Sequence, residues 1–169
     1  MQIRDAGAAD LPAIAAIYAA AAATSHATFD LEGRSIAWWQ DRLEEVDPAA
    51  GHLLLVAVDG TTVLGFARSG QHKEKAAYAT TVETSVYVDA EHRGRGVGDA
   101  LYAALLERLD ASDRRLAVAG VALPNDASER LHRAHGFTEI GVFEGVGVKH
   151  GHAWDVRWFQ RRLAGAPAL

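Results

Sequence analysis

The stretch from residue 82 to residue 101 constrains the fold most, because it predicts a strand, a glycine loop and a helix in direct succession. β-Branched residues occupy every second position from Val82 to Val88, the two-residue period of a pleated strand. Glu83 falls between them, so its carboxylate points away from the valine face. Apolar residues at helical spacing then predict a helix over residues 99–109.

Three glycines at alternate positions form the loop between this strand and helix. Gly94, Gly96 and Gly98 leave backbone N–H groups uncovered by side chains, so the loop can approach a bulky anion. Such an anion would face a helix N-terminus, where free N–H groups and the helix dipole favour negative charge. Arg93 and Arg95 add positive charge in the same segment. The loop therefore predicts an anion site.

Two familiar phosphate-binding motifs do not fit this loop. A P-loop needs Lys-Ser or Lys-Thr after its last glycine, where this sequence has Asp99-Ala100. A dinucleotide fingerprint needs a small residue three positions after its second glycine, and Asp99 stands there. A pyrophosphate cradle of another kind remains, with a plain glycine turn as the alternative interpretation.

Composition limits the class of protein. The chain has 169 residues, of which 49% are hydrophobic and 23% charged. This length and composition predict one globular domain over residues 1–169 with a sizeable core. No apolar run approaches the roughly 18 residues of a membrane span, and the N-terminal residues do not resemble a signal peptide. We therefore expect a soluble cytoplasmic protein without a membrane partner.

Charge and cysteine content narrow the chemistry. The sequence has no cysteine, which excludes disulfides, thiolate metal sites and an acyl-enzyme on cysteine. A formal charge of −5 argues against nucleic-acid binding. The pairs His150 with His152 and His132 with His135 bring no carboxylate or thiol at ligand spacing, so no metal is predicted.

The remaining sequence predicts alternating helices and strands. Asp59-Gly60 is a hairpin signal between two apolar runs, and Asn125 and Gly136 fit the start and end of a helix. The expected elements are a short strand at residues 3–4, helices from residue 10 and over 35–46, strands over 52–58, 61–67 and 116–123, a helix over 125–135, strands over 137–148 and 153–163, and a frayed tail over 164–169. This order predicts a mixed α/β sheet flanked by helices.

Several segments resemble a known family. The loop follows the pattern Arg-x-x-Gly-x-Gly that binds coenzyme A in the GNAT acyltransferase superfamily. The segments V-Y-V-D-A-E-H-R-G-R-G-V-G-D-A-L-Y, A-L-P-N-D-A-S-E-R-L-H-R-A-H-G-F and G-V-K-H-G-H-A-W-D-V are similar, in order, to signatures of the phosphinothricin and methionine sulfoximine N-acetyltransferases, as is the opening R-D-A-G-A-A-D-L-P-A-I-A-A-I-Y. This resemblance implies an α+β fold with a mixed, mostly antiparallel central sheet flanked by about four helices, acetyl-CoA as co-substrate, a small amino acid as acceptor, and a homodimer.

The resemblance also implies which residues contact acetyl-CoA. The strand backbone would bind the pantetheine arm, the glycine loop would bind the pyrophosphate, and one residue would come from the next loop. These positions are Val86, Tyr87, Val88, Gly94, Arg95, Gly96, Val97, Gly98, Asp99 and Asn125.

Acetyl transfer to an amine needs a base, because an ammonium group cannot attack a thioester. Glu83 corresponds to the family's proposed base, so we expect it to act directly or through a water. His132 stands where this family has a histidine, and we expect it to act as acid or proton relay for the leaving sulfur. The alternatives are a solvent-facing strand carboxylate and a helix-surface histidine.

The resemblance suggests substrate contacts as well. Lys73 and Lys75 match a segment that contacts substrate in the family and can pair with a carboxylate or phosphinate. The further candidates are Phe29, Thr84 and Ser85. His72 and Thr80 replace two tryptophans of the herbicide-acting members, which puts the identity of the amino acid in doubt.

Three other functions remain open from sequence. The acceptor could be another small amine, or an amine of a peptide or protein, which would need an open groove. The chain could also be an acyl-CoA sensor that does not catalyse transfer, although Glu83 argues against this.

Overall fold

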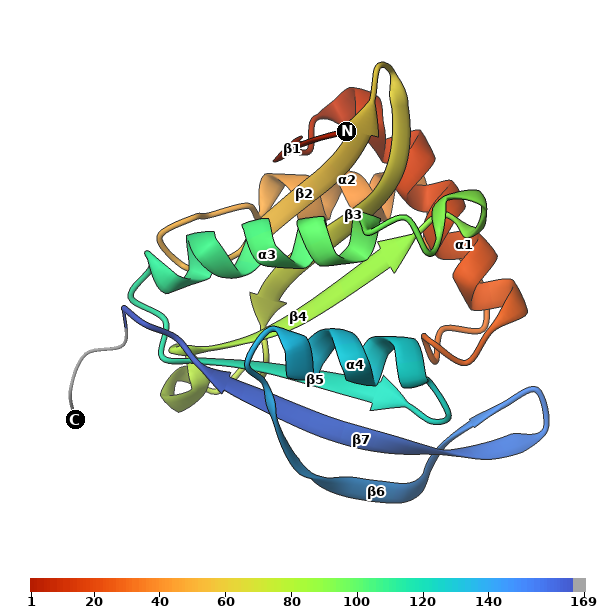
Figure 1. The fold of residues 1–169 in the computed structure, drawn as a ribbon, viewed down its shortest axis with the longest axis vertical. Helices are drawn as coiled ribbons and strands as arrows, with labels where there is room; N and C mark the ends of the chain where they lie inside the picture. The colour runs from red at the N-terminus through yellow and green to blue at the C-terminus, as the bar shows by residue number, and fades with distance from the viewer. Residues whose placement is uncertain (166–169) are drawn as a thin grey trace.

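The computed structural model describes residues 1–165. Over these residues the chain forms one sheet with helices on both faces (Figure 1). The last four residues of the predicted frayed tail, 166–169, lie outside the described residues. The elements are β1 (Gln2–Asp5), α1 (Leu11–Thr24), α2 (Ile36–Glu44), β2 (Leu53–Asp59), β3 (Thr62–Gln71), β4 (Thr81–Val88), α3 (Val97–Asp110), β5 (Leu116–Ala122), α4 (Asp126–Ala134), β6 (Thr138–Lys149) and β7 (His152–Arg162). Short 3₁₀ turns lie at Ala8–Asp10, Ala76–Tyr78 and Ala90–His92.

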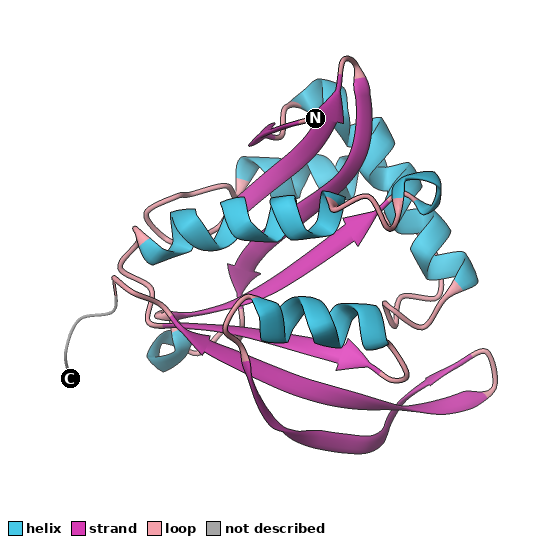
Figure 2. Ribbon diagram, in the orientation of Figure 1, coloured by secondary structure: helices cyan, strands magenta, loops and turns pink. Residues whose placement is uncertain are grey.

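The seven strands form one sheet in the order β1-β2-β3-β4-β5-β7-β6. β4 and β5 are parallel, and the other neighbouring pairs are antiparallel. Helices α3 and α4 cover one face, and α1 and α2 cover the other (Figure 2). The expected mixed, mostly antiparallel sheet and its element order are therefore confirmed. Within residues 1–165, no helix combines the length and apolarity needed to cross a membrane.

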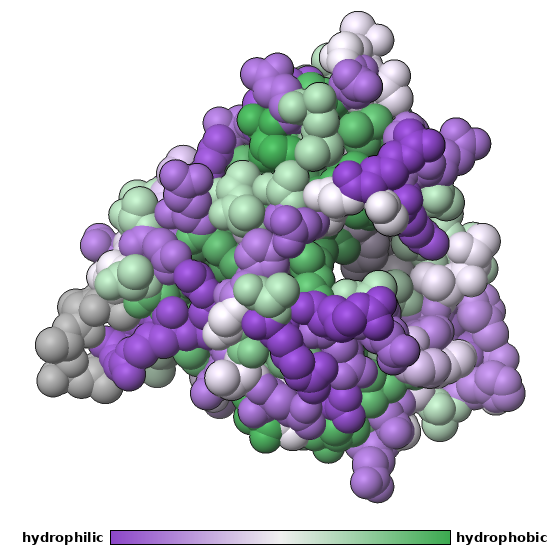
Figure 3. All heavy atoms as spheres, in the orientation of Figure 1, coloured by the Kyte–Doolittle hydropathy of each residue, from purple (hydrophilic) through white to green (hydrophobic). Residues whose placement is uncertain are grey.

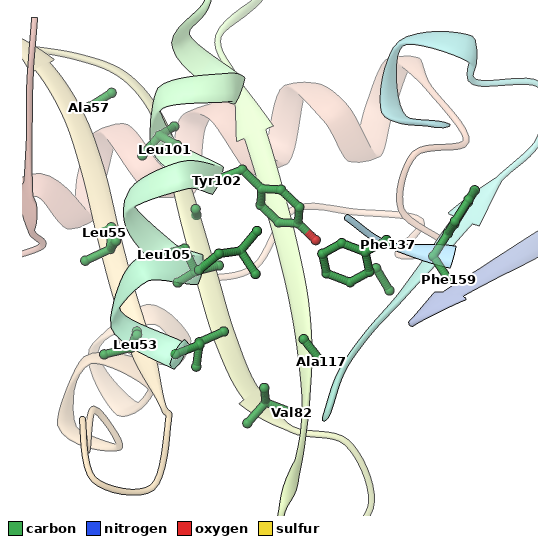
Figure 4. Close-up of a cluster of buried hydrophobic side chains, with 14 of the residues drawn as sticks. Leu53, Leu55, Ala57, Val82, Leu101, Tyr102, Leu105, Ala117, Phe137 and Phe159 are labelled. Atoms are coloured by element: carbon green, nitrogen blue, oxygen red, sulfur yellow. The ribbon is translucent and has the colours of Figure 1, made fainter. Parts of the chain in front are cut away.

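Strand β2 is buried on both faces because side chains of its apolar run pack into two cores. Leu53, Leu55 and Ala57 pack under α3, in a cluster with Leu101 and Leu105 (Figure 4). Their neighbours Leu54, Val56 and Val58 pack on the opposite face with α1 and Trp39 of α2. A continuous apolar run is expected of a strand buried on both faces. These two cores fix the positions of the helices and loops around the site.

Two boundaries differ from the sequence prediction in ways that matter for the site. α3 begins at Val97 because Gly96 takes a left-handed conformation with φ of 77° and serves as its N-cap, so the end of the glycine loop is the first helical turn. β3 continues to Gln71, beyond the predicted end at residue 67. Its polar end is held by the ladder to β4, where Arg68 pairs with Ser85 and Gly70 with Glu83.

Candidate active site

The site begins where β4 and β5 part from each other. Their parallel ladder holds for three residue pairs and ends at Glu83 with Val118. Beyond this point β4 stays paired with β3, and β5 stays paired with β7. Thr84 fills the apex, with its Oγ1 2.7 Å from the Tyr102 hydroxyl and 3.4 Å from the Val118 carbonyl. The diverging strands leave backbone on the facing edges of β4 and β5 without a ladder partner.

A first cavity of ≈ 570 Å³ opens at this divergence. It appears as a hollow between α3 and α4 in the space-filling view (Figure 3). Its walls are β4, the glycine loop, the end of β5 and α4. The predicted acetyl-CoA contacts on its walls are Val86, Tyr87, Val88, Gly94, Gly96, Val97, Gly98, Asp99 and Asn125. Arg95 is not among the residues that line it.

The glycine loop presents backbone N–H groups to this cavity. Gly94 and Gly96 both have positive φ, at 71° and 77°, a conformation that glycine adopts without strain. No side chain caps the N-terminus of α3, so the N–H groups of its first turn remain available for an anion. The carboxylate of Asp99 is paired with Nε2 of His135 at 2.9 Å. The loop has the geometry of an anion cradle.

Asn125 and His132 lie on the α4 side of the cavity. The side chain of Asn125 caps α4 by accepting a hydrogen bond from the Ser128 N–H at 3.1 Å. His132 is 4% exposed, and its Nδ1 lies 2.7 Å from the Ser128 carbonyl oxygen. Because a carbonyl only accepts, Nδ1 carries the proton. Burial lowers the pKa of His132, so the ring is neutral near pH 7 and its Nε2 is a proton acceptor.

A second cavity of ≈ 410 Å³ adjoins the first and contains Glu83. Both cavities are lined by the same stretch of β4 and the same part of β5, including Ser85 and Gly120. A Cβ on Gly120 would lie 3.2 Å from the Val156 side chain and 3.3 Å from that of Trp158, so glycine permits β7 to pack closely here. The two cavities therefore form one continuous site across the divergence.

Glu83 has a partner that the sequence did not reveal. Its Oε2 lies 3.0 Å from Nδ1 of His72, and 44% of the Glu83 side chain is exposed, against 16% for His72. The sequence suggested only that His72 departs from a family tryptophan. The pairing depends on the extension of β3, which brings the segment after Gln71 alongside the start of β4. The contact leaves the second carboxylate oxygen of Glu83 for another partner.

The loop between α1 and α2 closes one side of the second cavity. Phe29 lines it and packs against Gly147 so closely that a Cβ there would lie 2.2 Å from the ring. Lys149 is 1% exposed and its Nζ donates to the Thr28 carbonyl at 2.8 Å. Burial lowers the pKa of Lys149, against the opposing effect of Asp30. The β6–β7 hairpin thus holds this loop in place.

The remaining predicted substrate contacts lie in different environments. Ser85 lines the second cavity, whereas the hydroxyl of Thr84 is used at the apex. Lys73 lines a third cavity of ≈ 580 Å³, with its Nζ 5.1 Å from the centre of the Tyr78 ring. Lys75 is exposed just before the short turn Ala76–Tyr78.

Several residues of the second cavity carried no signal in the sequence. Phe143 and Val146 come from β6, and Val156 and Trp158 from β7. These residues reach the site because the hairpin of β6 and β7 packs against β5. The alternation of apolar and polar residues along a strand does not predict such packing between distant segments. Among residues 1–165, no three histidine, aspartate or glutamate side chains gather where they could hold a metal ion.

Comparisons with known proteins identify the family. The Acetyltransferase (GNAT) family matches residues 14–137. A phosphinothricin N-acetyltransferase of Streptomyces coelicolor is 48% identical over 112 residues. The match covers 65% of this chain and 66% of that protein, so it spans just under two thirds of the relative's length. An L-methionine sulfoximine/L-methionine sulfone acetyltransferase of Pseudomonas aeruginosa is 40% identical over 167 residues, 95% of this chain and 94% of that protein.

A solved structure agrees over nearly the whole chain. The crystal structure of a GNAT superfamily phosphinothricin acetyltransferase from Sinorhizobium meliloti in complex with AcCoA has a TM-score of 0.91 and 34% identity, covering 98% of this chain and 89% of that one. The fold, the glycine loop and these matches agree. The chain belongs to the GNAT acetyltransferase family and is a close relative, within it, of the phosphinothricin and methionine sulfoximine N-acetyltransferases.

Proposed function

We propose that this protein transfers the acetyl group of acetyl-CoA to the α-amino group of a small amino acid of the phosphinothricin, methionine sulfoximine or methionine sulfone type. The observation that carries the proposal is the continuity of the two cavities at the β4–β5 divergence. One cavity has an anion cradle at the N-terminus of α3, and the other contains the carboxylate of Glu83. The names of the relatives supply the class of acceptor.

The first cavity suits acetyl-CoA. The N–H groups of the glycine loop and of the first turn of α3 would bind the pyrophosphate. The unpaired edge of β4 would hydrogen-bond the amides of the pantetheine arm, as a neighbouring strand would. This arrangement directs the thioester toward the apex near Thr84, where the two cavities meet.

Glu83 is the general base in this proposal. It takes a proton from the acceptor's ammonium group, and the freed amine attacks the thioester carbonyl. His72 fixes one carboxylate oxygen by hydrogen bonding and leaves the other facing the amine. The C–N bond forms, the C–S bond breaks, the nitrogen gives up its second proton, and the thiolate takes up a proton. Because Nε2 of neutral His132 is an acceptor, His132 acts as a relay that must first receive the proton it passes to the sulfur.

The shape of the second cavity favours a small acceptor. Its volume of ≈ 410 Å³ lies near the lower end of the range for small-molecule pockets, roughly 300–1,000 Å³. Phe29, Phe143 and Trp158 provide apolar walls, and Lys73 in the neighbouring cavity can attract an anionic end. A peptide amine would need an open groove instead.

The expected homodimer remains a proposal. The edge strand β6 exposes apolar side chains on the surface, and a second copy of the chain could cover them. They are Ile140, Val142, Phe143, Val146 and Val148. Lone edge strands with exposed apolar residues are prone to pairing with another chain.

We predict that Gly98→Leu weakens binding of acetyl-CoA by about tenfold or more, because the side chain would cover the N–H groups of the cradle. A Cβ at Gly98 meets only the Val88 side chain, at 3.5 Å, so the fold should tolerate the change. Isothermal titration calorimetry measures the affinity. Gly141→Leu on β6 is the control, since a Cβ there meets nothing within 4 Å. Equal affinity in both variants would refute the cradle.

We predict that Glu83→Gln leaves acetyl-CoA affinity unchanged and lowers kcat by about 10²-fold or more near pH 7, the range for loss of a general base. The loss should shrink as pH rises, because the amine then deprotonates without help. Glu107→Gln, at an exposed position on α3, is the control and should match the parent. A pH–rate profile is the measurement, and an equal loss at every pH would assign Glu83 to positioning instead.

We predict that phosphinothricin, methionine sulfoximine or methionine sulfone is acetylated with a higher kcat/KM than a polyamine, an aminoglycoside or an N-terminal peptide. The small cavity and the cations beside it are the physical reason. Release of free thiol from acetyl-CoA measures the rates. A preference of tenfold or more for one of the last three, about 1.4 kcal/mol in transition-state binding, would overturn the acceptor class. No thiol release with any amine would favour an acyl-CoA sensor.

A further inference from the structure

Arg68 lies on the same face of the sheet as Glu83, two residue pairs away along the β3–β4 ladder. In the β3–β4 ladder Arg68 is opposite Ser85, and Gly70 is opposite Glu83. Residues that lie opposite each other in a ladder, and those two positions apart on a strand, share a face. The contact of Arg68 with Trp38 of α2 identifies this as the α1–α2 face, on which Glu83 also lies.

The guanidinium of Arg68 extends over the empty side-chain position of Gly70. A Cβ placed on Gly70 would lie 3.3 Å from Nη2 of Arg68. Because opposed Cβ positions in an antiparallel ladder are about 4.5–5.5 Å apart, this nitrogen lies within roughly 9 Å of the Cβ of Glu83. The two side chains nevertheless form no ion pair. The carboxylate of Glu83 is hydrogen-bonded to His72 instead. Glu83 and Arg68 therefore share one face of the sheet without pairing with each other.

Within residues 1–165, Arg68 makes no hydrogen bond and no ion pair. Its cation lies 5.8 Å from the centre of the Trp38 ring, beside Arg42 at 5.0 Å from the same ring. Arg42 has a counter-ion in Glu45. Burial lowers the pKa of Arg68, and the charge of Arg42 lowers it further. Glu45, which is paired with Arg42, acts in the opposite direction. A half-buried cation without an ion pair of its own is unfavourable, and an anionic ligand would relieve this cost.

The third cavity gives such a ligand access to this cation. Arg68, His72 and Lys73 all line this cavity of ≈ 580 Å³. His72 of this cavity hydrogen-bonds Glu83 of the second cavity, so the pair of side chains stands between the two cavities, which share no lining residue. An anionic group of a ligand held at Glu83 would have to extend past this pair to reach Arg68.

We propose that Arg68 binds the α-carboxylate of the amino-acid acceptor while Glu83 receives the proton of its amine. The inference rests on the proposed function and adds a subsite to it. In an α-amino acid, amine and carboxylate are bonded to one carbon, so their binding groups must lie close together on one surface. Arg68 and Glu83 meet this condition. Guanidinium binds a carboxylate through two parallel hydrogen bonds, which also fixes the orientation of the amine.

The test compares methionine sulfone with its α-carboxamide, which keeps the amine and side chain but removes the negative charge. Arg68→Met preserves packing against Trp38 and removes the guanidinium. We expect this variant to lower kcat/KM for methionine sulfone by about 10- to 100-fold, mostly through KM, the range for a lost hydrogen bond to a charged group. Its kcat/KM for the carboxamide should change by less than about twofold.

Arg42→Met is the matched control, because it removes the other guanidinium over the same ring. It should leave the preference for methionine sulfone over the carboxamide unchanged. Acetyl-CoA affinity and the urea midpoint of Arg68→Met check that the fold persists. Arg68→Lys keeps the charge without the two-pronged geometry and should recover part of the loss.

Each outcome decides the proposal. An Arg68→Met variant that keeps the full preference for methionine sulfone overturns the carboxylate subsite and leaves the proposed function standing. An equal loss for acid and carboxamide also overturns it, since this would indicate a structural role. A parent enzyme that acetylates no amino acid overturns both the subsite and the proposed function.

Discussion

The divergence of β4 from β5 is the constraint on which the site depends. Each strand is held by its other neighbour, β4 by β3 and β5 by β7, so the two can part after three residue pairs without loss of the sheet. Unpaired backbone groups inside a sheet are costly. Here Thr84 satisfies one of them at the apex by donating to the Val118 carbonyl, and the remaining edge is available to a ligand. The gap is thus maintained by the strands on both sides.

Two cores keep the groups around this gap in position. The core beneath α3 fixes the N-terminus of that helix, and hence the glycine loop, against the end of β4. On the opposite face, Tyr18 of α1 donates to Asp30, which Arg34 also binds. Together with Lys149 from the end of β6, these contacts hold the loop that carries Phe29. Elements from both ends of the chain therefore define the second cavity, where we propose that the acceptor binds.

Local patterns in the sequence predicted most of the fold, and long-range pairing supplied what they missed. Alternation along residues 82–88 placed Glu83 opposite the valine face, and the glycine spacing placed a loop with left-handed glycines directly before α3. The end of β3 is polar, so alternation gave no sign that it continues to Gln71. The pairings of Glu83 with His72 and Gly70 follow from that extension and could not be read from the sequence. Likewise, the walls from β6 and β7 depend on how the terminal hairpin packs.

The central claim is that the divergence brings the thioester and the acceptor amine together, so that acetyl transfer is direct. Initial rates measured while both substrates vary test this claim. The account predicts double-reciprocal lines that intersect, as for a complex of enzyme, acetyl-CoA and amino acid, and no gain in intact protein mass after incubation with acetyl-CoA alone. Parallel lines, together with an acetylated protein that passes its acetyl group to the amino acid, would contradict it.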